Sequence, residues 1–252
     1  MTLLEEYKNQ NTWREWERYL NKLPLNQKQT VYDLGCSIGI VSNLLSTKVK
    51  KVVGFDNDTY LLEEANKQKQ NNCEFVSENI FTLNPINLEK CDGIWLSFTL
   101  AYMEDPSLFI SKWAKCLNNG GWFAIVDIEG LFSRHLKVES KYFNEIQIFE
   151  SESKQSGVYD FKIGSKIKSL MEENGFEIII DENDWYDREL NFKGKAEDDI
   201  VENWAARFKR MIKLQSYFGT KYPEFYDEFL DNISDEKHIS EGCVQFYVGI
   251  KK

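Results

Sequence analysis

The sequence has few histidines and prolines, no paired cysteines and no long apolar segment. Its 252 residues include two histidines, four prolines and five dispersed cysteines without a C-x-x-C pair. An odd, dispersed set of cysteines is typical of reduced thiols, so neither a disulfide framework nor a zinc site is expected. No apolar run approaches bilayer length, and the N-terminus turns acidic at once, unlike a signal peptide. We therefore expect a soluble, cytoplasmic protein that does not act at a membrane.

Positive charge is also scarce. Lys and Arg total 31 and Asp and Glu total 41, which gives a formal net charge of −10. An acidic surface repels phosphate backbones, so nucleic acid is not expected as a partner. The length suits one α/β domain with elaborations and is sufficient to bury a substantial core.

The most informative stretch is V-Y-D-L-G-C-S-I-G, residues 31–39. Its first four residues indicate a buried strand, residues 35–39 a glycine-bearing turn, and residues 40–45 the start of a helix. Such a unit gathers unpaired backbone N–H groups at one point, and Asp33 can accept from a ligand ammonium or hydroxyl. About twenty residues later a second strand, 51–56, ends in Asp56, where a nucleoside's ribose hydroxyls would be held.

Two nucleoside cofactors could use this unit. A dinucleotide fingerprint requires G-x-G-x-x-G, whereas the spacing here is G-x-x-x-G, with Ser37 as the third residue of the turn. The segment resembles motif I of the Rossmann-like (class I) S-adenosylmethionine (SAM)-dependent methyltransferases, roughly D-x-G-C-G-x-G, with Ser37 in place of a glycine. The resemblance implies SAM as the cofactor.

Later segments extend the resemblance. Residues 75–79 resemble the family's F-V-x-x-D segment, with Asn79 where an acid meets the adenine amine and Ile80 on the adenine face. Residues 117–127 resemble its helix–GG–strand passage, with 118–121 closing the helix, and 174–177 (N-G-F-E) its late core. Ser97 and Phe98 follow the fourth strand, where ligands of open sheets bind. The expected cofactor residues are Asp33, Gly35, Cys36, Ser37, Gly39, Asp56, Asn57, Asn79, Ile80, Ser97 and Phe98.

The resemblance implies an α/β fold: a Rossmann-like three-layer sandwich whose mostly parallel seven-stranded sheet has an antiparallel last strand. We expect a single domain over 1–252, with a core of 24–128, 160–182 and 243–252. Residues 1–23 would form N-terminal lid helices, or equally packing helices, and 129–159 and 183–242 helical, aromatic insertions that cover the acceptor site. Within the insertions, 150–157 indicates a turn or mobile loop, and 193–219 contains the longest helix.

Candidate catalytic residues lie beside this core. His135 could serve as a general base, although a histidine is more often structural. Tyr102 follows the fourth strand and Glu129 the fifth, and both could instead cap or pack. Methyl transfer from an activated donor requires a base only where the acceptor must lose a proton, so no catalytic triad is needed.

Two further segments carry charge. Residues 184–187 (D-W-Y-D) combine aromatic rings with carboxylates, which could bind an amine or form a solvated loop. Arg207, Lys209, Arg210 and Lys213 lie on one predicted helix and could bind a carboxylate or phosphate, although such runs are usually solvated.

These observations predict a methyltransferase that uses SAM to methylate nitrogen or oxygen of a small organic acceptor. An aromatic content of 14% together with the acidity favours an amine or a nitrogen heterocycle. Two alternatives remain: a non-catalytic SAM- or nucleoside-binding protein, and an NAD(P)-dependent oxidoreductase, which the missing middle glycine disfavours.

Overall fold

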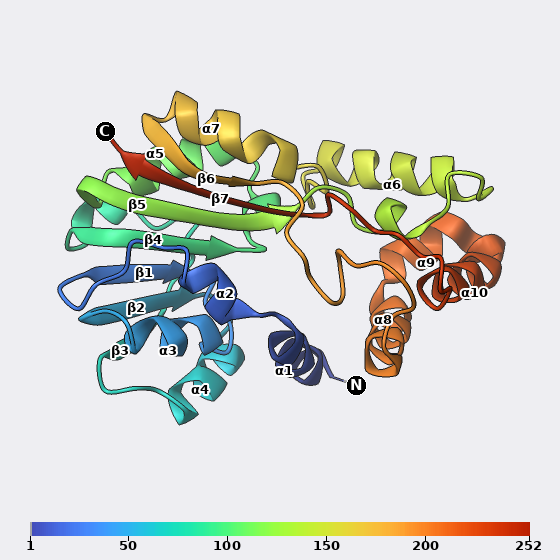
Figure 1. Cartoon of the computed structure of the whole chain (residues 1–252), viewed down its shortest axis with the longest axis horizontal. Coiled ribbons are helices and arrows are strands. Elements are labelled where there is room, and N and C mark those ends of the chain that lie inside the picture. The colour runs from blue at the N-terminus through green and yellow to red at the C-terminus, as the bar shows by residue number, and fades with distance from the viewer. Residues whose placement is uncertain (1) are drawn as a thin grey trace. The chain divides into compact units, whose positions relative to one another are not determined.

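The structure is a computed structural model that describes residues 2–252, and its chain divides into two compact units (Figure 1). The core unit comprises Glu15–Asp127, Ser165–Glu182 and Phe246–Lys252. The helical unit comprises Met1–Arg14, Ile128–Gly164 and Asn183–Gln245. The expected N-terminal segment 1–23 is thus divided between the units, and the assignment of the whole chain to one domain stays a prediction.

A seven-stranded sheet organises the core unit, in the order β3-β2-β1-β4-β5-β7-β6. β1 pairs in parallel with β2 and β4, and β6 pairs antiparallel with β7. The strands are β1 Thr30–Leu34, β2 Lys51–Asp56, β3 Cys73–Ser77, β4 Cys91–Ser97, β5 Leu117–Ile128, β6 Phe176–Glu182 and β7 Val244–Lys251. The fold class expected from the sequence is confirmed.

The strand order reverses direction between β1 and β4, so right-handed crossovers place the helices on opposite faces of the sheet. In agreement, α2 contacts α3, and α5 contacts α7. The helices of this unit are α2 Trp16–Leu20, α3 Ile40–Ser46, α4 Thr59–Lys67, α5 Pro106–Ala114 and α7 Ile167–Glu173. Coverage of both faces explains why β1 and β4 are almost continuously apolar and buried.

β5 begins earlier than the sequence indicates. Leu117 pairs with Cys91 and Trp122 with Gly93, so residues 118–121 bulge from the strand instead of closing α5. Gly120 in this bulge has φ 74°, a backbone that favours glycine. Gly93 is required opposite Trp122, because a Cβ there would lie 2.1 Å from the indole ring.

The helical unit contains α1 Leu3–Trp13, α6 Phe143–Gln155, α8 Asp198–Arg210, α9 Ile212–Phe218 and α10 Tyr222–Ile233. Its aromatic side chains pack mainly on one another, and five fully buried ones are Phe132, Trp204, Phe208, Phe225 and Phe229. Within residues 2–252, none of the helices combines the length and apolarity that a membrane-spanning segment requires.

Two expectations about the helical unit are wrong. Residues 150–155 belong to α6, so the expected turn or mobile loop is limited to a turn at 156–157. The long helix expected within 193–219 is divided into α8 and α9 at Met211, whose ψ of 68° lies outside the helical range. The break occurs because Tyr222 Oη and Gln215 Nε2 donate to the Phe208 carbonyl at 2.8 and 2.9 Å, and so occupy the acceptor that a continuous helix would use.

Candidate active site

The turn after β1 is fixed against the loops beside it. The N–H groups of Gly35 and Cys36 both donate to the Phe55 carbonyl of β2, at 2.8 and 3.0 Å. Gly35 has φ 75°, and a Cβ there would lie 2.6 Å from Thr99 Oγ1, in the loop after β4. Glycine is therefore needed at this position for both its backbone and the close approach of Thr99.

Asp56 joins the end of β2 to this turn. Its Oδ2 accepts from Ser37 N at 2.8 Å and its Oδ1 accepts from Asp58 N at 3.0 Å. An ionised carboxylate has about four acceptor positions, so two remain for ribose hydroxyls. Asn57 is exposed between them, and Asp58 caps α4 by accepting from Tyr60 N and Leu61 N.

The hydroxyl of Ser37 is available to a ligand. Ser37 has φ 49°, an uncommon backbone for a residue with a side chain. Its Oγ is buried and has no hydrogen-bond partner among residues 2–252. A buried polar atom without a partner at this turn fits a bound cofactor, as does the half-buried carboxylate of Asp56.

Asp33 lies beneath the turn, 2% exposed. Ser42 Oγ donates to its Oδ2 at 2.5 Å, yet burial raises the pKa of the carboxyl to about 7. A cation brought against it would favour the charged form. Ser42 was missed from the sequence, although a serine on the inward face of α3, beside Val41 and Leu45, was the available signal.

The loop after β3 carries the expected adenine residues. Asn79 is exposed, and its Oδ1 accepts from Phe81 N at 2.9 Å, so one further lone pair on that oxygen remains. Ile80 is 6% exposed, and its carbonyl accepts from Trp113 Nε1 at 3.3 Å. Helix α5 therefore positions this loop.

Ser97 and Phe98 lie half-buried at the end of β4. Phe98 has φ 50°, which is strained for a large side chain, and its N–H donates to the Val126 carbonyl at 2.7 Å. The ring of Trp16 from α2 meets the Phe98 ring edge-on, with centroids 6.2 Å apart. The two non-glycine residues with positive φ in the described chain, Ser37 and Phe98, follow the neighbouring strands β1 and β4.

The candidate catalytic residues are divided between the units. Tyr102 lies in the core unit, exposed, in a short 3-10 helix after β4. Glu129 and His135 lie in the helical unit, with Glu129 half-buried and its N–H donating to the Cys243 carbonyl. Their catalytic roles stay predictions.

His135 forms a buried pair with His238 that the sequence did not reveal. The two rings stack, with His135 Nδ1 3.2 Å from His238 Nε2. Burial lowers the pKa of His135 well below its usual range and that of His238 to about 4. Both rings are therefore neutral near pH 7, which agrees with the structural alternative.

The charged segments of the helical unit bind one another. Asp184 accepts from Asn191 Nδ2 and Gly242 N, which holds its pKa below the usual range, and Trp185 is buried. These contacts agree with a structural role for residues 184–187.

Arg207, on the expected basic face, is not solvated. Its guanidinium binds Glu6 at 2.8 Å and Glu189 at 2.5 Å, and Glu189 also binds Arg14 at 3.0 Å. Arg14 in turn binds Asp187, and Arg210 pairs with Glu6. Sequence patterns missed this buried network because its members come from distant parts of the chain.

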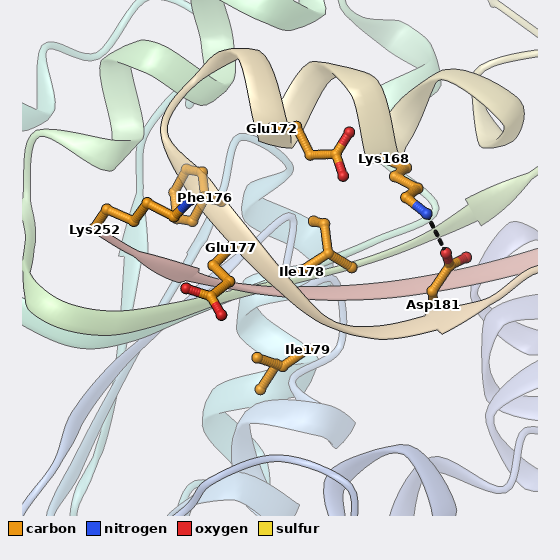
Figure 2. A pocket seen from close by; sticks show the side chains of 8 residues that line it. All are labelled: Lys168, Glu172, Phe176, Glu177, Ile178, Ile179, Asp181 and Lys252. Atoms are coloured by element: carbon orange, nitrogen blue, oxygen red, sulfur yellow. Dashed lines mark hydrogen bonds and ion pairs between the residues drawn. The ribbon is translucent and has the colours of Figure 1, made fainter.

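A pocket also lies at the outer edge of β6, between that strand and α7 (Figure 2). Lys168 and Asp181 bind across it at 2.6 Å, and Ile179 is 48% exposed beside them. It contains none of the expected site residues and lies at the sheet edge, whereas ligands of such sheets bind where strand order reverses. We therefore do not assign the active site to it.

Comparisons with known proteins found similarity to methyltransferases. Residues 32–125 match the model of a family described as "Methyltransferase domain". A candidate methyltransferase from Bacillus halodurans C-125 is similar in structure, with a TM-score of 0.64, 19% identity and coverage of 94% of this chain and 98% of that chain. An S-adenosylmethionine-dependent methyltransferase from Mesorhizobium loti has a TM-score of 0.58 and 16% identity, with coverage of 94% and 97%.

The [4+2]-cyclase SpnF has a TM-score of 0.59 and 13% identity, with coverage of 94% of this chain and 80% of that chain. A search of curated proteins found no match to the sequence. The family match covers the turn, Asp56 and the loops after β3 and β4, which are the segments of the candidate site. Residues 32–125 are therefore similar to a methyltransferase domain, and the chain has a Rossmann-like methyltransferase fold.

Proposed function

We propose that this protein transfers a methyl group from SAM to nitrogen or oxygen of a small organic acceptor. The observation that carries the proposal is the link between Ser37 N and Asp56 Oδ2, which joins the turn after β1 to the carboxylate that ends β2. Together they present a buried hydroxyl and a half-buried carboxylate to one ligand. Neither nucleic acid nor a membrane is part of this proposal.

SAM supplies an already activated methyl group when bound. The residues of the chain then have to bind SAM and the acceptor, orient them toward each other and exclude water. In this proposal Asp56 would hold ribose hydroxyls, Asp33 would meet an ammonium, and Ile80 would pack on an adenine. The strained Phe98 and the exposed Tyr102 both follow β4, where an acceptor would meet the cofactor. Tyr102 is the candidate catalytic residue that lies in the core unit.

A non-catalytic or differently reacting SAM-binding protein is the second candidate. Proteins that share a fold often differ in function, and SpnF, which has a similar fold, is a [4+2]-cyclase. A nicotinamide-dependent oxidoreductase is less well supported, because the turn has no glycine where a pyrophosphate would approach the backbone.

The test is methyl transfer from isotopically labelled SAM in cell extract, followed by mass spectrometry for a metabolite that gains one labelled methyl group. We expect a labelled product that is absent when the Asp56→Ala variant replaces the natural chain. Thermal stabilisation by SAM without any labelled product would favour the binding protein. Stabilisation by NAD(P) alone would contradict the proposal.

A further inference from the structure

Acidic and basic residues separate to opposite ends of the sheet in the core unit. The loops at the carboxyl ends of β1 to β4 are 35–39, 57–58, 78–84 and 98–105, and they contain no Lys, Arg or His. They carry four acidic residues, namely Asp58, Glu78, Glu104 and Asp105. The segments that lead into the same strands at their amino ends, 21–29, 47–50, 68–72 and 88–90, carry six lysines and one acid.

Exposed aromatic rings gather at the same end as the acids. Among the described residues of the core unit, the exposed aromatic side chains are Tyr60 at 58%, Phe81 at 45% and Tyr102 at 52%. Tyr60 lies in the first turn of α4, and the other two lie in the loops after β3 and β4. Carboxylates and exposed π-faces together favour organic cations, and they disfavour anions.

Asp33 and Asp56, the two acids of the proposed cofactor site, add to the negative charge at the carboxyl end. Burial raises the pKa of Asp33, and the negative charge of Asp56 adds to that rise, so the two carboxyl groups act on each other. Lys112 of α5 reaches the loop after β3, where its ammonium donates at 3.4 Å to the carbonyls of Phe81 and Thr82. Its ammonium therefore brings one positive charge to this end, where the four acidic loop residues outnumber it.

We infer that the acceptor is an organic amine, and that the carboxyl end of the core unit selects against acceptors that carry a carboxylate or a phosphate. This inference rests on the proposed methyl transfer and narrows its acceptor. The amine attacks as its free base: its lone pair forms the new N–C bond while the C–S bond breaks and leaves its electron pair on sulfur. One positive charge passes from sulfur to nitrogen, so it stays near the same acidic residues throughout the reaction. If the product ammonium carries a proton on nitrogen, it then loses that proton to water.

The test compares two probes of similar shape and opposite charge, benzyltrimethylammonium and phenylacetate, on protein saturated with S-adenosylhomocysteine. We expect the cation to bind at least tenfold more tightly by calorimetric titration, with an affinity that falls as salt is added. The variant Glu78→Gln/Glu104→Gln removes two exposed charges at the carboxyl end, and it should weaken cation binding about threefold or more. Glu89→Gln, an exposed acid at the amino end, is the matched control and should leave cation binding unchanged.

Equal or tighter binding of phenylacetate, or no measurable binding of the cation, would overturn the inference. So would a loss of affinity that is the same in Glu89→Gln as in the double variant. The proposed function is tested separately, by titrating S-adenosylhomocysteine before the probes are added. Absence of binding in that titration would contradict the proposed function. If that ligand binds and a phenol or carboxylate is the acceptor methylated in extract, the function stands and the amine is excluded.

Discussion

At the scale of single residues, Asp33 is a buried carboxyl whose charged form is costly to the fold. Its carboxyl is 2% exposed, accepts from Ser42 Oγ, and titrates at about 7 because burial penalises its charged form. Proteins commonly have such destabilised groups at binding sites, where contacts with a ligand offset the free-energy cost of burying the charge. A cationic ligand group would do so here.

Asp33→Asn should stabilise the unliganded protein in alkaline buffer. Between pH 3.8 and about 7 the folded protein keeps a proton that the unfolded chain has released. Its free energy of unfolding therefore falls as pH rises through this window, by on the order of 1.4 kcal/mol per unit. The amide keeps the hydrogen bond from Ser42 but does not titrate, so the variant's advantage should grow with pH.

Thermal unfolding of both proteins across this window, without SAM, measures the effect. Asp181→Asn, an exposed acid in the same unit, is the control and should show no such trend. A stability difference that does not change with pH would show that Asp33 is charged in the unliganded fold.

At the scale of elements, Glu150 explains why α6 replaces an expected loop. Its Oε1 accepts from three successive N–H groups, those of Leu131, Phe132 and Ser133, at 3.0, 2.8 and 3.2 Å, and Ser133 Oγ donates to its Oε2 at 2.7 Å. The acidic and serine-rich composition of 150–157 indicated a solvent-exposed segment, whereas Glu150 is only 1% exposed. The signal was tertiary, so no local pattern could provide it.

Glu150→Ala should lower the free energy of unfolding by about 3 kcal/mol, because three N–H groups lose their acceptor inside the fold. Glu150→Gln keeps one oxygen and should lose about half as much. Glu152→Ala, on the exposed face of the same helix, is the matched control and should be near neutral. Urea unfolding followed by circular dichroism measures all three, and equal losses in Glu150→Ala and Glu152→Ala would contradict this role.

The sequence predicted those elements that depend on local pattern. The strand, turn and helix of residues 31–45 and the carboxylate at the end of β2 all follow from residue order and spacing. It failed where side chains far apart in the chain compete with the backbone, as Tyr222 does at the Phe208 carbonyl. It also missed Ser42, Thr99 and the His135–His238 pair, because only the folded chain brings these partners together.

At the scale of the whole molecule, the expected site residues are distributed unequally between the two units. The core unit contains every expected cofactor residue, and its charges separate along the strands. The helical unit satisfies its own charges: Arg14 and Arg207 are held by Asp187, Glu189 and Glu6. A basic helix face that the sequence offered for an anionic acceptor is thus partly used to hold α1 to α8.

The central claim is that Asp56 and the turn after β1 together hold the adenosine of SAM. Calorimetric titration of SAM into the natural protein, Asp56→Ala and Asp181→Ala tests it most directly. We expect Asp56→Ala to weaken binding at least tenfold, because a hydrogen bond to a charged group contributes roughly 1.5–3 kcal/mol. Asp181→Ala, beside the pocket at β6, should bind SAM as the natural protein does. Unchanged affinity in Asp56→Ala, or an equal loss in both variants, would contradict the account.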